Sequence, residues 1–273
     1  MDEINGDRRV LLAGLGIAVA GSLLAATTAQ AGDLEPPPGP VTPTKKKLAE
    51  LDKKIARTDE GFAEPRIPVE SLPGSVNALH VISESGSYYL AENLQGQSGK
   101  HGIVIAADNV DLDLGGFHVL GVPGSLSGII SDRQNVTVFD GTLLGWGTAV
   151  DFENASRFIL WDVVSMGAGA DAFSVGSHGQ VYDCDAYGAG ESGFKMKAAK
   201  EKSVMEECGA WQCSVGFACL GSRNLFLANC ATDNGTAFDI GPGNSFGPIV
   251  DVVGVGDISA VPGTDHPGAN FVY

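Results

Sequence analysis

The sequence predicts an all-β fold, a right-handed parallel β-helix of about seven coils of ~22 residues each, preceded by a short N-terminal helix. From Asn77 onward β-branched residues, Gly and Asp or Asn dominate, and no helical period is present. In this region a small residue followed by a large apolar residue recurs about every 22 residues. The pairs are Gly102-Ile103, Gly128-Ile129, Ala149-Val150, Ala172-Phe173, Gly193-Phe194, Gly216-Phe217 and Ala237-Phe238.

Two further columns keep the same period. A second apolar column follows most of these pairs, and a third column places a polar turn-forming residue before a small one, because Asp and Asn side chains bond nearby backbone in tight turns. The second column is Val110, Val136, Phe158, Val181, Val204 and Leu225. The third is Asp140-Gly141, Asp162-Val163, Asp183-Cys184, Glu207-Cys208 and Asn229-Cys230.

A parallel β-helix accounts for these columns because its coils stack about 4.8 Å apart and bring equivalent residues into ladders. Leucine-rich repeats have a similar period, but their regular Leu/Asn consensus is missing. A β-sandwich would not keep a fixed interval through so many repeats.

The five cysteines fit the same scheme. Cys184, Cys208 and Cys230 occupy one column on successive coils, so we expect their sulfurs to stack as small core residues. Cys213 and Cys219 lie outside that column, and the sequence leaves open whether they form a local disulfide. No CxxC spacing is present, which argues against a zinc site.

The first 31 residues are typical of an export signal. Arg8-Arg9 precede an apolar run from Val10 to about Ala26, which closes on Ala29-Gln30-Ala31. The paired arginines favour the twin-arginine route to the periplasm or the outside of the cell. The general secretory route and a retained membrane anchor are the alternatives. With a cleaved signal, no membrane association is expected.

Residues 32–76 are predicted to be a Pro-rich linker that contains one short helix at 44–57. Leu48, Leu51 and Ile55 fall on one face of that helix, while its lysines face solvent. The β-helix domain is expected to span 77–273.

The net charge of −16 restricts the choice of partner. An acidic surface repels phosphate backbones, so nucleic acid is not an expected partner.

The chain resembles a known family in two segments, Lys100–Ser125 (KHGIVIAADNVDLDLGGFHVLGVPGS), which Ser85–Leu94 (SGSYYLAENL) precedes, and Gly241–Tyr273 at the C-terminus. Both are similar to bacterial secreted right-handed parallel β-helix repeat proteins of the pectate-lyase-like superfamily. The resemblance covers about residues 65–273 and departs at Gly268, where the family's tail usually carries Trp. It implies no established activity, although many members of the superfamily bind or cut acidic polysaccharides.

The catalytic residues of the superfamily can be sought in this sequence. A pectate-lyase-like site needs carboxylates that hold Ca²⁺ and an arginine base. Asp111 with Asp113, and Asp183 with Asp185, are candidate metal ligands at i, i+2 spacing. The arginines Arg133, Arg157 and Arg223 lie in no lyase motif, and Arg157, Arg223 and His178 read as turn residues.

Aromatic and basic side chains suggest a binding face instead. Trp146, Trp161, Tyr187 and Trp211 could stack on sugar rings, or could pack beneath loops. Of these, Trp146, Tyr187 and Trp211 occupy nearly one column. Lys195 and Lys197 belong to the main basic cluster and could hold a sugar carboxylate, or could pair with Glu191 and Glu201.

The sequence therefore predicts an exported, non-catalytic β-helix protein that binds polysaccharide or has a structural role. Its alternative is a polysaccharide lyase, hydrolase or epimerase with an unrecognised site.

Overall fold

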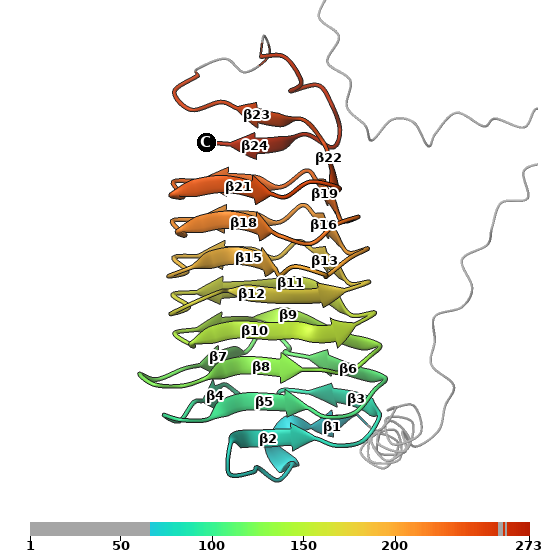
Figure 1. Cartoon of the computed structure of the whole chain (residues 1–273). Helices are drawn as coiled ribbons and strands as arrows, with labels where there is room; N and C mark the ends of the chain where they lie inside the picture. Colours follow the sequence, from blue (N-terminus) through green and yellow to red (C-terminus); the bar gives the residue numbers. More distant parts are fainter. Residues whose placement is uncertain (1–65, 256–258, 260) are drawn as a thin grey trace, which may run out of the picture. The chain divides into compact units, whose positions relative to one another are not determined.

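The computed structural model describes residues 66–255, 259 and 261–273. These residues form a right-handed parallel β-helix of about nine turns, in which the chain climbs from β2 to β23 and then returns to β24, which lies between β20 and β23 (Figure 1). The predicted signal at 1–31 and the predicted helix at 44–57 lie outside the described residues. The described part of the predicted linker contains strand β1 and a short 3-10 helix, η1 (Val69–Ser71), which pack on the first coils.

One sheet has eight strands, all parallel to their neighbours and all in the front of Figure 1. Its strands are β2 (Ala78–Ile82), β5 (His101–Ile105), β8 (Ser127–Ser131), β10 (Thr148–Ser156), β12 (Phe173–Ser177), β15 (Ser192–Met196), β18 (Val215–Cys219) and β21 (Thr236–Ile240).

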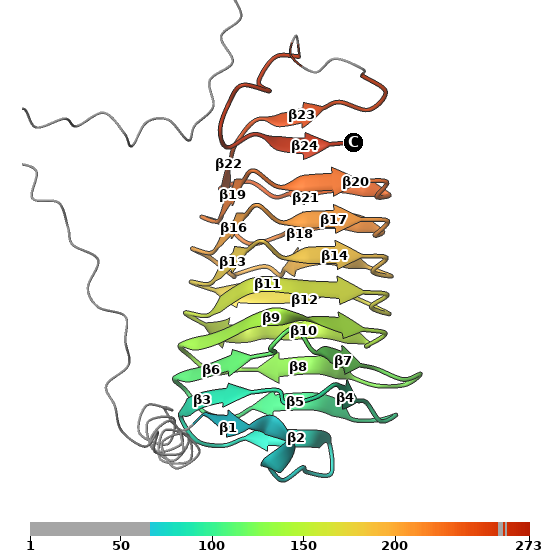
Figure 2. The same cartoon turned by 180° about the vertical axis from the view of Figure 1, so that it is seen from behind.

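The other sheet has sixteen strands and bends into two arms, seen from behind in Figure 2. The first arm comprises β1 (Ile67–Pro68), β3 (Gly86–Tyr89), β6 (Val110–Asp113), the first halves of β9 (Val136–Leu144) and β11 (Ile159–Met166), β13 (Gln180–Tyr182), β16 (Val204–Glu206), β19 (Leu225–Leu227) and β22 (Ser245–Phe246). The second arm comprises β4 (Leu94–Gln95), β7 (His118–Leu120), the second halves of β9 and β11, β14 (Asp185–Tyr187), β17 (Gly209–Trp211), β20 (Cys230–Thr232), β24 (Asn270–Val272) and β23 (Ile249–Asp251).

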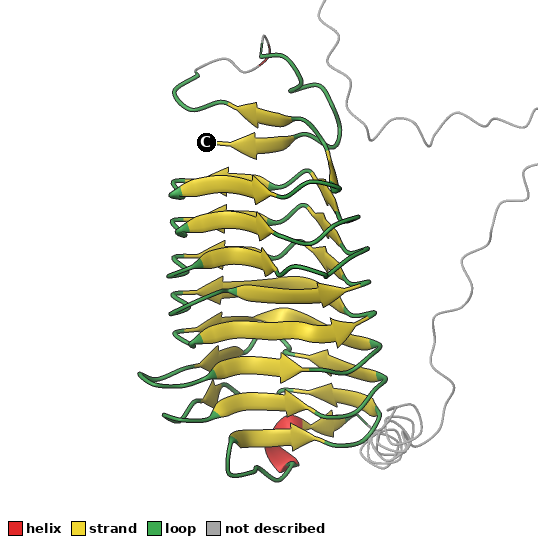
Figure 3. Ribbon diagram, viewed as in Figure 1, coloured by secondary structure: helices red, strands yellow, loops and turns green. Residues whose placement is uncertain are grey.

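The coils turn at corners formed by short loops, drawn green in Figure 3. Residues with left-handed backbone conformation recur at these corners. Asn and Asp tolerate this conformation because their short polar side chains bond locally. The corner between the two arms carries Asp140, Asp162, Asp183, Glu207 and Ala228. The corner before the first arm carries Asn109, Asn135, Arg157, His178, Lys202 and Arg223, which confirms that Arg157, His178 and Arg223 are turn residues.

The first predicted apolar column is confirmed in register. Ile103, Ile129, Val150, Phe173, Phe194, Phe217 and Phe238 lie opposite one another on successive strands of the eight-stranded sheet. The four phenylalanine rings stack nearly parallel, with centroids 4.8 to 5.0 Å apart. They form the spine of the core.

The count of seven coils was too low. The strand before Ile103 carries His80 in the same column, and this residue does not fit the apolar pattern. The last turn is formed by β23 and β24, which follow no repeat that the sequence shows.

The second predicted column was wrong in its upper half. It holds for Val110 and Val136, but Val181 lies opposite Leu160 and Met205 rather than Phe158 and Val204. Met205 and Phe226 are buried there, whereas Val204 and Leu225 are only half-buried. One residue of slip in a strand moves a side chain to the opposite face.

The predicted cysteine column was also partly wrong. Cys184 and Cys208 are buried, but Cys230 lies opposite Gly209 and Asn229 takes the interior place. The Asn229 amide accepts the Cys208 N–H at 3.0 Å and donates to the Met205 carbonyl at 3.0 Å. The Asn229 side chain therefore satisfies the Cys208 N–H and the Met205 carbonyl at the corner between the two arms. Cys213 and Cys219 are free thiols, so they do not form a disulfide.

Candidate functional site

The outer face of the first arm carries a row of large side chains that the sequence analysis did not assemble. Phe139, Trp161 and Tyr182 lie opposite one another on β9, β11 and β13. The rings of Phe139 and Trp161 stack with centroids 6.2 Å apart, and Trp161 remains 50% exposed. An exposed indole supported from one side is free to stack on a ligand ring with the other.

Two adjoining hollows follow this arm. The first, of about 500 Å³, is lined by Thr137, Ile159, Trp161 and Tyr182, and on its corner side by Asp183, Glu206 and Glu207. The second, of about 380 Å³, shares Thr137 and Ile159 and adds Asn109, Asp111, Asn135 and Arg157. Together they form a shallow groove across β6, β9, β11, β13 and β16. Five strands about 4.8 Å apart span about 19 Å, which suits a chain of three or four sugar rings.

The corner beside this groove is acidic. Asp162, Asp183 and Glu207 stack there on successive coils, and Glu206 ends β16 next to them. None of these four carboxylates forms an ion pair or side-chain hydrogen bond within the described residues. The pKa of Asp185, just beyond the corner, is raised by burial and by the charges of Asp162 and Asp183.

Beyond the corner, the second arm presents Tyr187 and Trp211. Their rings stack at 4.6 Å and 10°, as neighbours in register on β14 and β17. The Trp211 ring lies over Gly209, where an added Cβ would come within 1.8 Å of it. Glycine is therefore required for this flat platform, of which the Tyr187 ring is 36% exposed.

Trp146, the third member of the predicted aromatic column, does not belong to that platform. Its side chain is 1% exposed and fills the interior, where Nε1–H donates to the Val119 carbonyl at 2.8 Å. Trp146 lies in the turn between β9 and β10, whereas Tyr187 and Trp211 lie on strands. A similar distance from the second apolar column therefore did not place Trp146 on the same face.

Lys195 lies on β15 of the other sheet and Lys197 directly follows that strand, and both are already paired. Lys195 Nζ donates to Asp171 at 2.9 Å and to Glu191 at 2.8 Å, and Lys197 Nζ donates to Glu153 at 2.6 Å. Glu201, the other predicted partner, pairs instead with Lys202 and Arg223.

The four predicted metal-ligand aspartates do not converge. Asp113 pairs with Arg66 and accepts the Gly115 N–H, whereas Asp183 and Asp185 flank the corner several coils further along. Among the residues the structure describes, no group of three or more His, Cys, Asp and Glu is placed to hold a metal ion.

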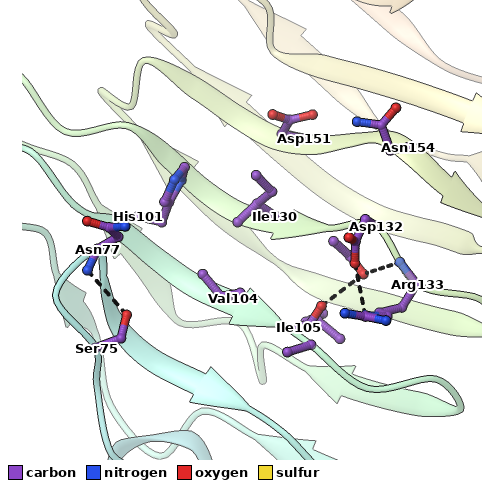
Figure 4. Close-up of a pocket in the computed structure, with 12 residues that line it drawn as sticks. Ser75, Asn77, His101, Val104, Ile105, Ile130, Asp132, Arg133, Asp151 and Asn154 are labelled. Carbon is purple, nitrogen blue, oxygen red and sulfur yellow. Dashed lines mark hydrogen bonds and ion pairs between the residues drawn. The ribbon is translucent and has the colours of Figure 1, made fainter.

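A further hollow, of about 480 Å³, lies on the eight-stranded sheet and combines polar and apolar side chains (Figure 4). His101 lies on β5 and Asp151 on β10. The strand between them, β8, carries Ile130 opposite Asp151. Burial lowers the pKa of His101, which Asp151 partly offsets, and burial raises the pKa of Asp151. The Nδ1 atom of His101 accepts the Ser127 N–H at 3.1 Å, and Arg133 pairs with Asp132 at 2.9 Å.

The sequence placed Trp161 among the aromatic residues that could stack on sugar rings but outside the predicted column, although a signal for its own row was present. Phe139 and Trp161 each follow their second-column residue by three positions, so they share a row. Tyr182 joins that row only because of the slip at Val181.

No helix within the described ranges is long and apolar enough to cross a membrane. Comparison with protein-family models, with curated proteins and with solved structures finds no match to this chain. The structure itself shows a right-handed parallel β-helix with a groove lined by aromatic rings, beside a corner whose carboxylates form no ion pair within the described residues.

Proposed function

We propose that this chain is an exported, non-catalytic β-helix protein that binds carbohydrate along the outer face of its sixteen-stranded sheet. The observation that carries the proposal is the exposed Trp161, which stacks on Phe139 and lines a groove long enough for three or four sugar rings. Sugar rings present C–H faces that stack on aromatic rings and hydroxyl groups that bond to polar edges.

The groove offers both kinds of contact. Trp161 and Tyr182 supply ring surface, and Asn109, Asn135 and Thr137 supply amide and hydroxyl groups along the neighbouring strands. The Tyr187–Trp211 platform provides a second stacking surface beyond the corner. The regular strand spacing favours an extended, repeating ligand over a compact one.

Export and family are part of the same proposal. Arg8-Arg9 and the apolar run after them support a twin-arginine signal, and the parallel β-helix fold supports membership of the pectate-lyase-like superfamily. Fractionation of cells expressing the full chain tests the export route. An Arg8→Lys, Arg9→Lys variant should remain in the cytoplasm, and unaltered export of this variant would exclude the twin-arginine route.

Binding is tested with a glycan array probed by the purified mature chain, with and without Ca²⁺. Trp161→Ala should lower the affinity for any bound glycan about tenfold, the size of a central aromatic contact. Leu220→Ala is the matched control, because Leu220 is 62% exposed but lies in a turn of the eight-stranded sheet. Equal affinity of the two variants would reject the groove as the binding site.

A second candidate is catalysis in the hollow that contains His101 and Asp151. A carboxyl of raised pKa near a neutral imidazole is an arrangement suited to proton transfer in glycan cleavage. The assay looks for new reducing ends or unsaturated sugar products from bound glycans. Products that disappear in Asp151→Asn would favour this candidate, and binding without products would favour the first.

A further inference from the structure

The groove on the first arm carries a charge pattern that selects among glycans. Its first hollow combines the ring faces of Trp161 and Tyr182 with three carboxylates, those of Asp183, Glu206 and Glu207. No basic side chain lines this hollow, and none of the three carboxylates is neutralised within the described part of the chain.

The contrast with the rest of the molecule makes this pattern informative. On or just before strands of the eight-stranded sheet, Asp171, Glu191 and Glu153 each have a lysine within 2.9 Å. At the next corner of the same coils, Glu201 is bound by Arg223 and Lys202. By contrast, Asp183, Glu206 and Glu207 have no ion-pair partner among the described residues and lie in the hollow that Trp161 and Tyr182 line.

We propose that this hollow binds a sugar carrying a free, protonated amino group, such as a glucosamine unit of a partly or fully deacetylated chain. An ammonium group gains from carboxylates at the hollow's edge and from the face of an indole ring, which attracts cations. Uronic acid units would instead be repelled there by three like charges. The inference rests on the proposed function and names the class of glycan.

The second hollow is consistent with a sugar chain of mixed character. It contains Arg157 and Asp111 together with Asn109 and Asn135, so it has no charge excess of one sign. Neutral or N-acetylated units can occupy this part of the groove. The amino-sugar selectivity is thus confined to the side of the groove that borders Asp183 and Glu207.

The test compares three tetrasaccharides by calorimetric titration of the mature chain at one mildly acidic pH and low salt. They are the β-linked tetramer of glucosamine, the corresponding tetramer of N-acetylglucosamine and a tetramer of galacturonate. The glucosamine tetramer should bind about tenfold more tightly than the acetylated one, which is the sum of a few exposed charge contacts. Galacturonate should bind most weakly, and added salt should reduce only the preference for glucosamine.

Two variants assign the preference to the hollow. Glu206→Gln, Glu207→Gln should bring glucosamine affinity close to that of the acetylated tetramer and leave the latter unchanged. The matched control is Glu92→Gln, an exposed acid on an early coil that should alter neither affinity.

The outcomes distinguish a failure of the amino-sugar inference from a failure of the proposed carbohydrate binding. Equal binding of the amino and acetylated tetramers, or tighter binding of galacturonate, would overturn the amino-sugar inference while leaving carbohydrate binding intact. A preference that survives in the Glu206→Gln, Glu207→Gln variant would also overturn it. Failure of all three tetramers, together with an empty glycan array, would refute the proposed function itself.

Discussion

The two sheets share one interior but present different outer surfaces. On the side of the eight-stranded sheet, lysines pair with several acids, as in the contacts of Lys195 with Asp171 and Glu191. The outer face of the sixteen-stranded sheet holds exposed rings beside carboxylates that have no cation. The repeat that builds the coil therefore does not determine the surface chemistry.

The difference separates residues that stabilise the protein from residues that are available to a ligand. Paired charges on the eight-stranded sheet contribute to folding, whereas the aromatic groove and its acidic corner contribute little to it. Uncompensated like charges and exposed rings are retained at some cost in stability, which is common at binding sites.

The largest effect should come from the interior that both faces depend on. Phe194→Ala removes a fully buried ring from the middle of the phenylalanine stack and should lower the free energy of unfolding by about 3 to 5 kcal/mol. Phe238→Ala, at the half-buried end of the stack, should cost less. Urea denaturation measures both. A larger loss at Phe238 would contradict the assignment of the spine.

On the eight-stranded face, Lys195→Met should lower the free energy of unfolding by about 2 kcal/mol, because Asp171 is nearly buried and would lose its counter-charge. Lys197→Met is the control, since its pair with Glu153 is more exposed and should be worth about 0.5 kcal/mol. Thermal unfolding of the two variants checks this. Equal losses would show that burial of Asp171 is unimportant.

On the aromatic face, Trp161→Ala should change stability by less than about 1 kcal/mol, since it removes one half-exposed stacking contact. The affinity for glycan should nevertheless fall about tenfold. Chemical denaturation and titration of the same preparation test both statements. A loss of stability as large as that of Lys195→Met would mean that Trp161 is mainly structural.

The two faces should respond oppositely to acid. The pKa of Asp185 is raised by burial and by Asp162 and Asp183, so its favourable contribution is fully present below the unfolded pKa and is lost as pH rises through the folded one. Asp185→Asn should therefore stabilise the protein at neutral pH, by about 0.5 kcal/mol for a half-exposed group.

Glu191 behaves in the opposite way, because its pKa is lowered by the hydrogen bond and charge of Lys195. Its contribution is present above the unfolded pKa and is lost as pH falls through the folded one. Glu191→Gln should destabilise the protein slightly at neutral pH and not in acid. Unfolding curves across this range test the two signs, and a common sign would remove the contrast.

The smallest effect concerns the thiols. Burial raises the pKa of Cys208 to about 12 and also raises that of Cys184, so neither should react with a thiol reagent in the native state. Cys230 is half-buried on the outer side of β20 and should react slowly. Mass spectrometry after labelling identifies the modified residue. Rapid labelling of Cys184 would place it outside the core.

The sequence was sufficient for the fold because the interior repeats strictly. Every residue from Ile103 to Phe238 in the first column lies in the predicted ladder, since each must fill the same space between stacked coils. The second column failed above Phe158, because a change of one or two residues in a corner shifts the strand without disturbing the apolar content. Val204 and Met205 are equally apolar, and only the register decides which of them is buried.

The candidate site was less predictable, because side chains on the outer face of a sheet need not fill a fixed space between stacked coils. Tyr187 and Trp211 were correctly paired, but Trp146 has an interior role that depends on the turn it occupies. Asp171, the buried partner of Lys195, is separated from it by 24 positions in the chain. Contacts of this kind follow from the stacking of coils and cannot be read from local spacing.

The phenylalanine stack ends at Phe238, and this gives the molecule a direction. At the N-terminal end, backbone bonds from Ser75 to Ala78 and from Val81 to Pro73 cover the edge of β2. At the other end, no strand of the described residues pairs with the outer edge of β21. Opening should therefore begin at β21 and progress coil by coil toward β2, so that amide hydrogen exchange would show a gradient of protection along the axis.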